Sequence, residues 1–392
     1  MDQACFRKKR NCCDQVMALT TYIESGFEKR LKTGVVFLDL SAAYDTVWRK
    51  GLMLKLSGII KCRHALAIIM NILSDRSFQV EMGNKTSRVR VLNNGLPQGS
   101  VLSSFLYDIC RDIYTSDVPT TKSRKFMYVD DNALAFQAKS FEEIEKTINE
   151  DLEILNGYFK TWRLRPNTGK TVSCSFHLNN RQANYQLKIK FDDDDVRHEK
   201  FSGLRARINV VQKLTGTSWG CSAKTLRITT KAMILPIADY CSPIWMGSAH
   251  VKVIDTQINV AMRIITGTVY STPIPRIYAL SNITPMSILM EQSAIRECLK
   301  IHNNPRLPIY NDIQSAPATP RLKSRKPFWN FYRNFQEMEN LKTIWKQWWT
   351  ASDVTNLIDD PTAEIEGAEL SRRLWSRLNR IRTGHGCCAY MI

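Results

Sequence analysis

The sequence predicts a mixed α/β (α+β) fold in its first half and a mainly helical second half. Three observations support this prediction: a short apolar run at residues 35–40, two hairpin patterns, and an amphipathic helix pattern at residues 140–162. Near residue 203 the pattern becomes helical and is punctuated by proline. At roughly 100–200 residues per domain, the chain has room for two or three domains.

The first half reads as alternating strands and helices. The predicted strands, which are short apolar or alternating runs, are residues 35–40, 77–82, 86–92, 125–129, 133–137, 171–177 and 185–191. The predicted helices, which carry apolar residues at helical spacing, are residues 46–56, 64–73, 100–113 and 140–162. Gly58 is expected to end the first of these helices, and Gly83-Asn84 to form the turn of the first hairpin.

The remaining segments are predicted from their turn and charged residues. Residues 93–99 form a loop, and Asp192 to Asp195 a solvated acidic loop in preference to a metal site. Residues 303–327 resemble a linker or an irregular crossing, and a Trp-rich helical tail follows. We therefore expect three regions: residues 1–200, a helical region at 201–302, and a basic C-terminal region at 303–392.

The charge of the chain is strongly positive. Its 55 Lys and Arg residues against 37 Asp and Glu give a formal net charge of +18. Nucleic acid is the commonest polyanionic partner of so basic a protein, and a basic surface kept only for solubility is the alternative. A hydrophobic content of 44% excludes wholesale disorder. No apolar run reaches the ~20 residues that a membrane helix needs, and the N-terminus lacks a secretory signal, so we expect an intracellular protein of the nucleus or cytoplasm.

The cysteines indicate reduced thiols. There are 11, an odd number, scattered through a chain long enough to fold without disulfides. No C-x-x-C pair is present, which argues against a structural zinc site. His385 with Cys387 and Cys388 lacks the spacing of zinc ligands, so a frayed tail is the preferred interpretation.

Three carboxylates stand out by their context. Asp39 ends an apolar strand, while Asp130 and Asp131 occupy the tip of an apolar hairpin. Taken singly, each is typical of a helix cap or a solvated turn. Paired strands would bring the three together at one end of a sheet, where carboxylates are the ligands that Mg²⁺ prefers. Two such ions, about 4 Å apart, serve in-line phosphoryl displacement.

Four blocks in order resemble the polymerase motifs of reverse transcriptases. Residues 37–45 (FLDLSAAYD) resemble motif A, residues 95–102 (GLPQGSVL) motif B, residues 128–131 (YVDD) motif C, and residues 162–171 motif D. The resemblance is strongest to polymerases of jockey-type non-LTR retrotransposons, and it extends through residues 214–220, 239–245 and 378–386. It implies a right-hand polymerase palm with an antiparallel sheet and partial fingers, then a thumb-like helical half. Relative to that family, the chain is expected to be truncated at both ends.

The resemblance also implies roles for individual residues. Asp39, Asp130 and Asp131 would bind two Mg²⁺ ions, with the Leu40 carbonyl as a further ligand. Tyr44 would act as the gate that excludes a ribose 2′-hydroxyl, and Gln98 with Gly99 would form the floor under the template base. Tyr128 is the aromatic residue of motif C, and Lys170 would contact the pyrophosphate. The implied partners are an RNA template, a DNA primer and deoxynucleoside triphosphates.

A basic segment near the C-terminus is a candidate nucleic-acid surface. Its candidate contacts are Arg321, Lys323, Arg325, Lys326 and Arg333. Aromatic rings are interleaved with them, but Trp345, Trp348 and Trp349 at helical spacing are expected to be core residues. Basic side chains are therefore the better candidates.

Three functions are compatible with these patterns. The first is an RNA-directed DNA polymerase, and the second is a catalytically inactive element copy that only binds nucleic acid. The third is a two-metal nuclease or phosphatase, which shares the carboxylates but has no use for the Gly95–Gly99 loop or Tyr44. Primer extension separates the first from the second, and template hydrolysis would indicate the third.

Overall fold

The computed structural model describes residues 10–41, 44–97, 100, 103, 106, 118–128, 131–182, 184–198, 221–248, 251–318, 326–336, 340–352, 358–363 and 365–385. The chain forms two compact units, residues 1–200 and 201–392, each with a core of its own. The first unit mixes helices and strands, and the described part of the second contains only helices. The predicted α/β fold class is thereby confirmed.

A five-stranded sheet forms the centre of the first unit, in the order β11-β8-β1-β7-β6. Its strands are β1 (Lys32–Leu38), β6 (Arg124–Tyr128), β7 (Asp131–Ala138), β8 (Val172–Phe176) and β11 (Arg197–His198). β1 is antiparallel to both β7 and β8, β6 is antiparallel to β7, and β11 is parallel to β8. The four longer strands confirm the predicted apolar runs, and β1 lies in the middle because both of its edges are paired.

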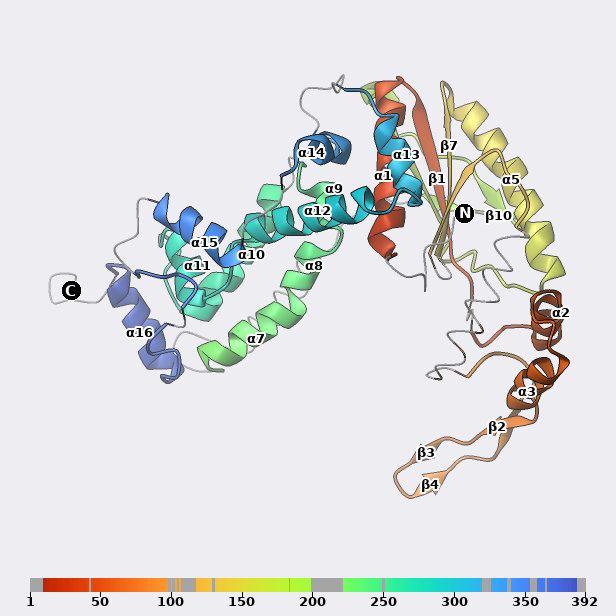
Figure 1. Ribbon diagram of the computed structural model, residues 1–392, viewed down its shortest axis with the longest axis horizontal. Helices are drawn as coiled ribbons and strands as arrows, with labels where there is room; N and C mark the ends of the chain where they lie inside the picture. The colour runs from red at the N-terminus through yellow and green to blue at the C-terminus, as the bar shows by residue number, and fades with distance from the viewer. Residues whose placement is uncertain are drawn as a thin grey trace. The chain divides into compact units, whose positions relative to one another are not determined.

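Helices cover the two faces of this sheet (Figure 1). On one face lies α5 (Phe141–Thr161), which begins at Ser140, whose hydroxyl accepts the Glu143 N–H. Its apolar stripe is buried, with Ile144 and Ile148 fully inaccessible. On the other face lies α1 (Cys12–Glu28), whose first turn is closed by a reciprocal pair of hydrogen bonds between Asn11 and Asp14. The Tyr22 ring of α1 lies 6.0 Å from the ring of Phe126 on β6.

A buried carboxylate joins α5 to the start of β6. Asp151 is 1% exposed and accepts the N–H of Lys122 at 3.0 Å and that of Ser123 at 2.7 Å. Two backbone donors that precede the strand are thereby satisfied away from water. The anchor positions the strand that carries Tyr128, and nothing in the local sequence pattern predicts it.

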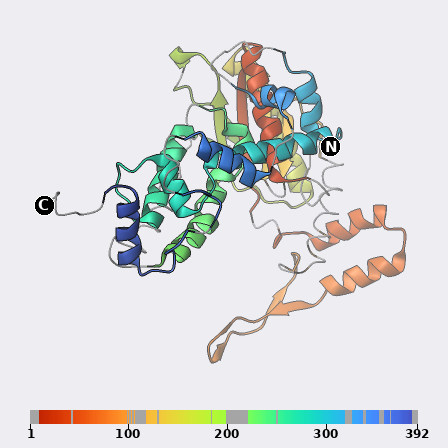
Figure 2. The ribbon, with the colours of Figure 1, turned by 60° about the vertical axis from the view of Figure 1, so that its left-hand side comes forward.

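A helical hairpin and a β-hairpin follow β1. They comprise α2 (Arg49–Ile59), α3 (Arg63–Leu73), β2 (Arg76–Phe78), β3 (Glu81–Met82), β4 (Lys85–Thr86) and β5 (Arg90–Leu92). The prediction that Gly58 ends this helix is wrong, because α2 continues to Ile59. Figure 2 shows α2 and α3 side by side, with the strands continuing from α3.

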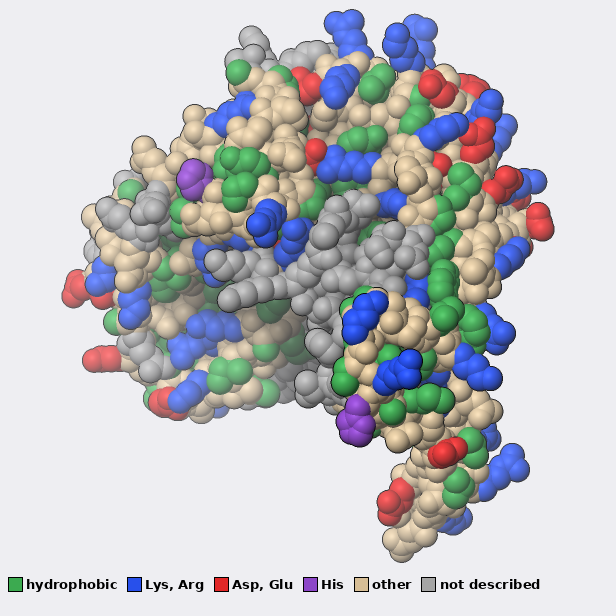
Figure 3. Space-filling view, turned by 45° about the vertical axis from the view of Figure 1, so that its right-hand side comes forward, with side chains coloured by type: hydrophobic (Ala, Val, Ile, Leu, Met, Phe, Trp, Pro, Cys, Tyr) green, Lys and Arg blue, Asp and Glu red, His purple; other side chains and the backbone are tan. Residues whose placement is uncertain are grey.

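The predicted β-hairpin is present but bulged. β2 pairs Phe78 with Arg90, whereas two residues further on Val80 exchanges hydrogen bonds with Ser87. One residue on the first arm therefore faces two on the second, Arg88 and Val89, which makes a β-bulge. Basic and apolar side chains alike are exposed along this hairpin (Figure 3).

The segment at 185–191 was predicted as a strand, but only β9 (Lys190–Phe191) is one. Leu187 and Ile189 are buried as the alternation implies. The backbone beside them is bonded by α5 side chains instead of a neighbouring strand: the Lys188 N–H donates to Glu145 and the Lys190 N–H to Asn149. Alternation thus predicted the buried face correctly, but not the partner of the backbone.

The acidic run is an exposed turn followed by a short strand. Asp192 and Asp193 both have positive φ, and they connect β9 to β10 (Asp194–Asp195). The Asp192 carboxylate accepts hydrogen bonds from Asn156 and Lys160, each at 2.9 Å. All four carboxylates are exposed, so the prediction of a solvated acidic segment is confirmed.

The second unit is a bundle of helices around an apolar core. Its helices are α7 (Ala223–Met233), α8 (Leu235–Asp239), α9 (Ser242–Trp245), α10 (Val251–Thr266), α11 (Ile274–Ser281), α12 (Met286–His302), α13 (Pro308–Gln314), α14 (Phe328–Asn334), α15 (Leu341–Thr350) and α16 (Arg372–Arg382). Trp345 and Trp349 are buried, as their spacing predicted, and Trp348 packs against Tyr278.

The expected linker at 303–327 is wrong over part of its length. Pro308 begins α13, and the side chains of Ile309 and Ile313 on this helix are buried. Proline is favourable in the first turn of a helix, and two isoleucines four positions apart share one face. The Pro-rich composition therefore concealed a short amphipathic helix.

The end of α10 is closed by side chains from α16. The guanidinium of Arg372 donates to the carbonyls of Ile264 and Ile265, and the Trp375 ring also donates to Ile265. Further along α16, Asn379 donates to Thr266 and Arg380 to Gly267. The last carbonyls of a helix lack internal partners, and here another helix supplies their donors.

Two expectations from the sequence concern membranes and thiols. Among the helices described, none has the length and apolar character that crossing a bilayer requires. No disulfide joins the cysteines of the described ranges, which are Cys12, Cys13, Cys62, Cys174, Cys221, Cys241 and Cys298. Cys387 and Cys388 lie outside the described residues.

Candidate active site

Asp39 follows directly after β1 and is held by the segment that precedes β8. The carbonyl of Asp39 accepts the Asn167 N–H at 2.8 Å, and the Ser41 N–H donates to the Arg165 carbonyl at 2.8 Å. Leu40 pairs with Pro166 in an isolated antiparallel bridge. The strand end that carries Asp39 is therefore fixed by main-chain bonds to a segment more than a hundred residues away.

The same segment brings Lys170 to Asp39. Thr171 and Lys170 both donate their N–H to the carbonyl of Asn167, which makes a tight turn. The Lys170 Nζ lies 3.9 Å from Asp39 Oδ2, with the two side chains 73% and 29% exposed. Lys170 is thus an accessible cation beside the carboxylate, as a group that meets an anionic ligand must be.

Asp131 lies across the sheet from Asp39. The register of β1 and β7 ends with Leu38 opposite Asn132, so Asp39 directly follows the last paired residue of β1 and Asp131 directly precedes that residue's partner on β7. Opposite residues of an antiparallel pair point to the same face. Tyr128 pairs with Asp131 across the β6–β7 hairpin and shares that face. Asp130 lies outside the described residues.

The Leu40 carbonyl is directed toward the β7 edge. In an extended chain successive carbonyls alternate between the two edges, and the Asp39 carbonyl is already bonded on the Asn167 side. Among the described residues no donor contacts the Leu40 carbonyl. An oxygen in that position matches the ligand role that the family resemblance implies for it.

The donor set suits Mg²⁺. Two carboxylates and a carbonyl oxygen are hard ligands, and a Mg²⁺ site needs only a few of them with water and phosphate. Within the described ranges no three acidic, His or Cys side chains gather into a metal cluster. The third expected carboxylate, Asp130, falls outside those ranges, so the described part of the site contributes two of the three.

The backbone of Tyr44 is hydrogen-bonded to the loop that precedes Gln98 in the sequence. The Leu96 N–H donates to the Tyr44 carbonyl and the Gly95 N–H to the Val47 carbonyl, both at 2.9 Å. Gly95 has a φ of +83°, and a Cβ there would lie 2.6 Å from the Asp45 carbonyl oxygen. Only glycine fits this backbone approach. Gln98 and Gly99 themselves lie outside the described residues.

Arg49 is a residue of this site that the sequence reasoning missed. Its guanidinium donates to the carbonyls of Leu92 at 2.8 Å, Asn94 at 3.0 Å and Gly95 at 2.9 Å. A weak signal was present, because Arg49 and Lys50 begin α2, where the helix dipole favours acidic residues and none occurs. A cation in that position indicates a partner elsewhere.

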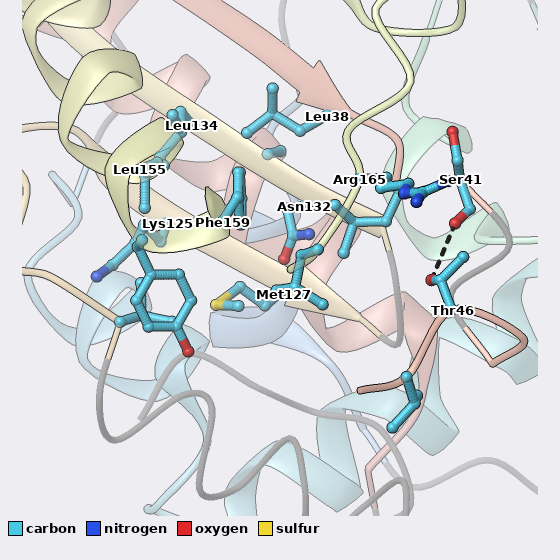
Figure 4. Close-up of a pocket in the computed structure, with 16 residues that line it drawn as sticks. Leu38, Ser41, Thr46, Lys125, Met127, Asn132, Leu134, Leu155, Phe159 and Arg165 are labelled. Carbon is cyan, nitrogen blue, oxygen red and sulfur yellow. Dashed lines mark hydrogen bonds between the residues drawn. The ribbon is translucent and has the colours of Figure 1, made fainter. Parts of the chain in front are cut away.

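A cavity of about 60 Å³ lies between the strand end at Leu38 and the side chains of α5 (Figure 4). Its lining is mainly apolar and includes Leu38, Leu134, Leu155 and Phe159. Leu38 alternates with Asp39 along the chain, so the cavity belongs to the α5 face and the carboxylates to the other. Its apolar lining does not suit a triphosphate, and the candidate active site is the carboxylate face.

The predicted C-terminal nucleic-acid surface is described only in part. Arg321, Lys323 and Arg325 lie outside the described residues, and Lys326 is exposed. The Arg333 guanidinium donates to the carbonyls of Ile313, Ala316 and Pro317. A phosphate contact by Arg333 would therefore compete with bonds that close the end of α13.

Comparison with known proteins gives a consistent family. Residues 1–203 match the family of reverse transcriptases (RNA-dependent DNA polymerases). A probable RNA-directed DNA polymerase from transposon BS of Drosophila melanogaster is 32% identical over 182 residues, covering 44% of this chain and 20% of that protein. The RNA-directed DNA polymerase from mobile element jockey of Drosophila funebris is 26% identical over 180 residues, covering 44% and 19%.

A third relative extends the match into the second unit. The probable RNA-directed DNA polymerase from transposon X-element of Drosophila melanogaster is 23% identical over 354 residues, covering 82% of this chain and 38% of that protein. The chain therefore spans less than half the length of these curated relatives. Among solved structures, apo telomerase from Candida tropicalis aligns with 13% identity and a TM-score of 0.35, over 74% of this chain and 54% of that one.

The family match covers the whole first unit and therefore all the described residues of the candidate active site. The relatives confirm the resemblance to jockey-type mobile elements that motifs A to D indicated. This chain belongs to the reverse transcriptase (RNA-dependent DNA polymerase) family.

Proposed function

We propose that this chain catalyses RNA-directed DNA synthesis at the end of β1. In this reaction the 3′-oxygen of a DNA primer forms a bond to the α-phosphorus of a deoxynucleoside triphosphate, and pyrophosphate leaves. The observation that carries the proposal is the register of β1 and β7, which ends at Leu38 opposite Asn132 and so leaves Asp39 and Asp131 at the same end of the sheet, with the Lys170 ammonium 3.9 Å from Asp39. Membership of the family supports it.

Each residue of the site has a role in this reaction. Asp39, Asp130 and Asp131, with the Leu40 carbonyl, would hold two Mg²⁺ ions, which supply charge neutralisation for the attacking and leaving oxygens. Lys170 meets the charge that develops on the pyrophosphate and can donate it a proton. Tyr44 excludes a ribose 2′-hydroxyl, Tyr128 contacts the nucleotide or the template, and Gln98 with Gly99 forms the floor under the template base.

The charge of the chain supports a nucleic-acid substrate. An RNA template and a DNA primer are polyanions, and a net charge of +18 favours their association at low salt. The exposed cation Lys326, with Arg321, Lys323 and Arg325, would contact phosphates, and Arg333 would do so only in exchange for its carbonyl partners.

Primer extension on an RNA template tests the proposal. We expect Asp39→Asn and Asp131→Asn each to lose more than about a hundredfold in rate, because groups that merely support a metal ligand already cost about 10- to 100-fold when removed. Asp194→Asn, an exposed carboxylate on β10, is the matched control and keeps the wild-type rate.

The outcomes separate the alternatives. Equal extension by the wild type and Asp39→Asn would refute the proposed site. Salt-sensitive binding of primer–template without extension by the wild type would identify a binding protein that has lost catalysis. Template hydrolysis that Asp39→Asn abolishes would point to a nuclease.

A further inference from the structure

Arg49 joins the turn that carries Tyr44 to the loop at 92–96. Its Nε, Nη1 and Nη2 each donate to a different carbonyl, those of Gly95, Leu92 and Asn94. The three acceptors belong to the loop that runs directly into Gln98 and Gly99. All three guanidinium nitrogens therefore donate to main-chain oxygens. No other side chain carries three donors in the same planar geometry.

The loop returns hydrogen bonds to the turn that carries Tyr44. Gly95 donates to the Val47 carbonyl and Leu96 donates to the Tyr44 carbonyl. With the guanidinium bonds, five hydrogen bonds connect the turn at 44–49 to the loop at 92–96. The position of the Tyr44 backbone is thus coupled to that of the loop before Gln98.

The surroundings of Arg49 make these bonds strong. Partial burial, followed by the nearby positive charge of Arg76, lowers the pKa of the Arg49 guanidinium, which stays charged at neutral pH. Its charge is met by carbonyl dipoles, and no carboxylate pairs with it in the described part of the chain. Hydrogen bonds from a charged donor are about twice as strong as neutral ones.

We propose that Arg49 is a positioning residue that holds the loop at 92–96 against the turn that carries Tyr44, and thereby sets how strictly the site selects its nucleotide. The inference rests on the proposed function, because that function makes Tyr44 the residue that excludes a ribose 2′-hydroxyl. It adds a residue from outside the four polymerase motifs, and it predicts that sugar selection depends on a side chain that never touches the nucleotide.

The first test follows the loop itself and needs no activity. Hydrogen–deuterium exchange is measured on the full chain as wild type, Arg49→Gln and Lys50→Gln. Lys50 is the matched control, since it is the next residue of α2, is exposed, and donates no hydrogen bond to the described residues of the loop. We expect the amides of Gly95 and Leu96 to exchange at least about tenfold faster in Arg49→Gln, the factor for one lost charged hydrogen bond.

Exchange in β1 and β7 distinguishes loop release from unfolding. These strands are expected to keep wild-type protection in Arg49→Gln. Unchanged exchange at 92–96, or an equal rise throughout the first unit, would overturn the inference. If Arg49→Gln does not fold, Arg49→Lys replaces it, because lysine keeps the charge but cannot reach three carbonyls with fixed geometry, and a smaller rise confined to the loop is then expected.

The second test measures selectivity. In primer extension, Arg49→Gln is expected to raise the KM for deoxynucleotides more than it lowers kcat. The ratio of kcat/KM between deoxy- and ribonucleotides is expected to fall about tenfold, in line with the same lost interaction. Lys50→Gln keeps both values.

The two tests fail in different ways. A wild type that extends no primer refutes the proposed function, while the exchange measurement still decides whether Arg49 orders the loop. An active enzyme whose loop loosens in Arg49→Gln without any change in sugar selectivity would overturn the inference and leave the proposed function intact.

Discussion

Gly95 is the residue at which the loop of the candidate site approaches the preceding turn most closely. Its φ is +83°, and an added Cβ would meet the Asp45 carbonyl oxygen, carbon and Cα within 3 Å. Two separate penalties therefore fall on one substitution: a left-handed backbone with a side chain, and a collision with main chain that cannot rotate away.

We expect Gly95→Ala to lower the free energy of unfolding of the first unit by at least about 2 kcal/mol, and to slow primer extension. Gly83→Ala at the hairpin tip is the matched control, since Gly83 has a φ of +60° and open space around it. It should cost only about 1 kcal/mol, the backbone term alone. Equal losses for the two variants in denaturant titrations would contradict the close approach.

At the scale of elements, α5 organises the sheet edge through its polar residues as well as its apolar stripe. Asp151 accepts two main-chain N–H groups ahead of β6, while its neighbour Glu150 forms an exposed ion pair with Lys122. The two carboxylates are adjacent in sequence and differ chiefly in burial.

That difference predicts unequal losses of stability. Asp151→Ala should lower the free energy of unfolding by about 2–4 kcal/mol, because each unsatisfied buried donor costs about 1–3 kcal/mol. Glu150→Ala removes a solvent-exposed pair, and its loss should cost far less because water and salt already screen the two charges. Urea titration of both variants measures the difference, and a larger loss for Glu150→Ala would refute this account of the anchor.

Elements with a continuous pattern were predictable from sequence. β1, the β6–β7 hairpin and α5 match their apolar runs because tertiary burial and local periodicity agree there. Residues 185–189 did not form a strand, and the N–H groups of Lys188 and Lys190 donate to Glu145 and Asn149 of α5 instead. α13 was missed because proline suggested an irregular segment, although proline also begins helices.

The candidate site was predictable where a residue's own neighbours define it. Asp39 directly follows β1 and Asp131 begins β7, and the antiparallel register of these strands leaves both at the same end of the sheet, where the apolar runs of the sequence predicted them. Arg49 and Asp151 could not be assigned, because their partners are main-chain groups 43–46 and 28–29 residues away, respectively. Every residue has a backbone carbonyl, and every residue except proline an amide N–H, so the sequence does not show which of these groups a side chain will bond.

At the scale of the whole molecule, two units imply that unfolding need not be a single transition. Tryptophan fluorescence reports mainly on the second unit, because seven of the nine tryptophans lie beyond residue 200. Trp349 donates its ring N–H to the Ile358 carbonyl at 2.9 Å, and Lys346 on the same helix pairs with Asp360 at 2.7 Å.

The hydrogen bond from Lys346, with a second from Thr362, lowers the pKa of the Asp360 carboxyl to about 2 from its ordinary 3.8. A lowered pKa stabilises the fold above the ordinary value, and that stabilisation is lost as the pH falls through 4 toward 2. Tryptophan fluorescence should therefore report a decline in stability over this range in the wild type, and a smaller decline in Asp360→Asn.

Asp359→Asn is the matched control for this titration. Asp359 is adjacent to Asp360 and exposed, so its variant should keep the wild-type pH dependence. The interpretation fails if Asp359→Asn and Asp360→Asn flatten the acid limb equally.

The arginines that cap main-chain carbonyls have a consequence for how the net charge is counted. Arg49, Arg333, Arg372, Arg380 and Arg382 all direct guanidinium donors at carbonyl oxygens of their own chain. A guanidinium held in this way raises the formal charge but does not displace a counterion from a nucleic-acid strand. The salt dependence of binding will therefore correspond to far fewer phosphates than +18 suggests.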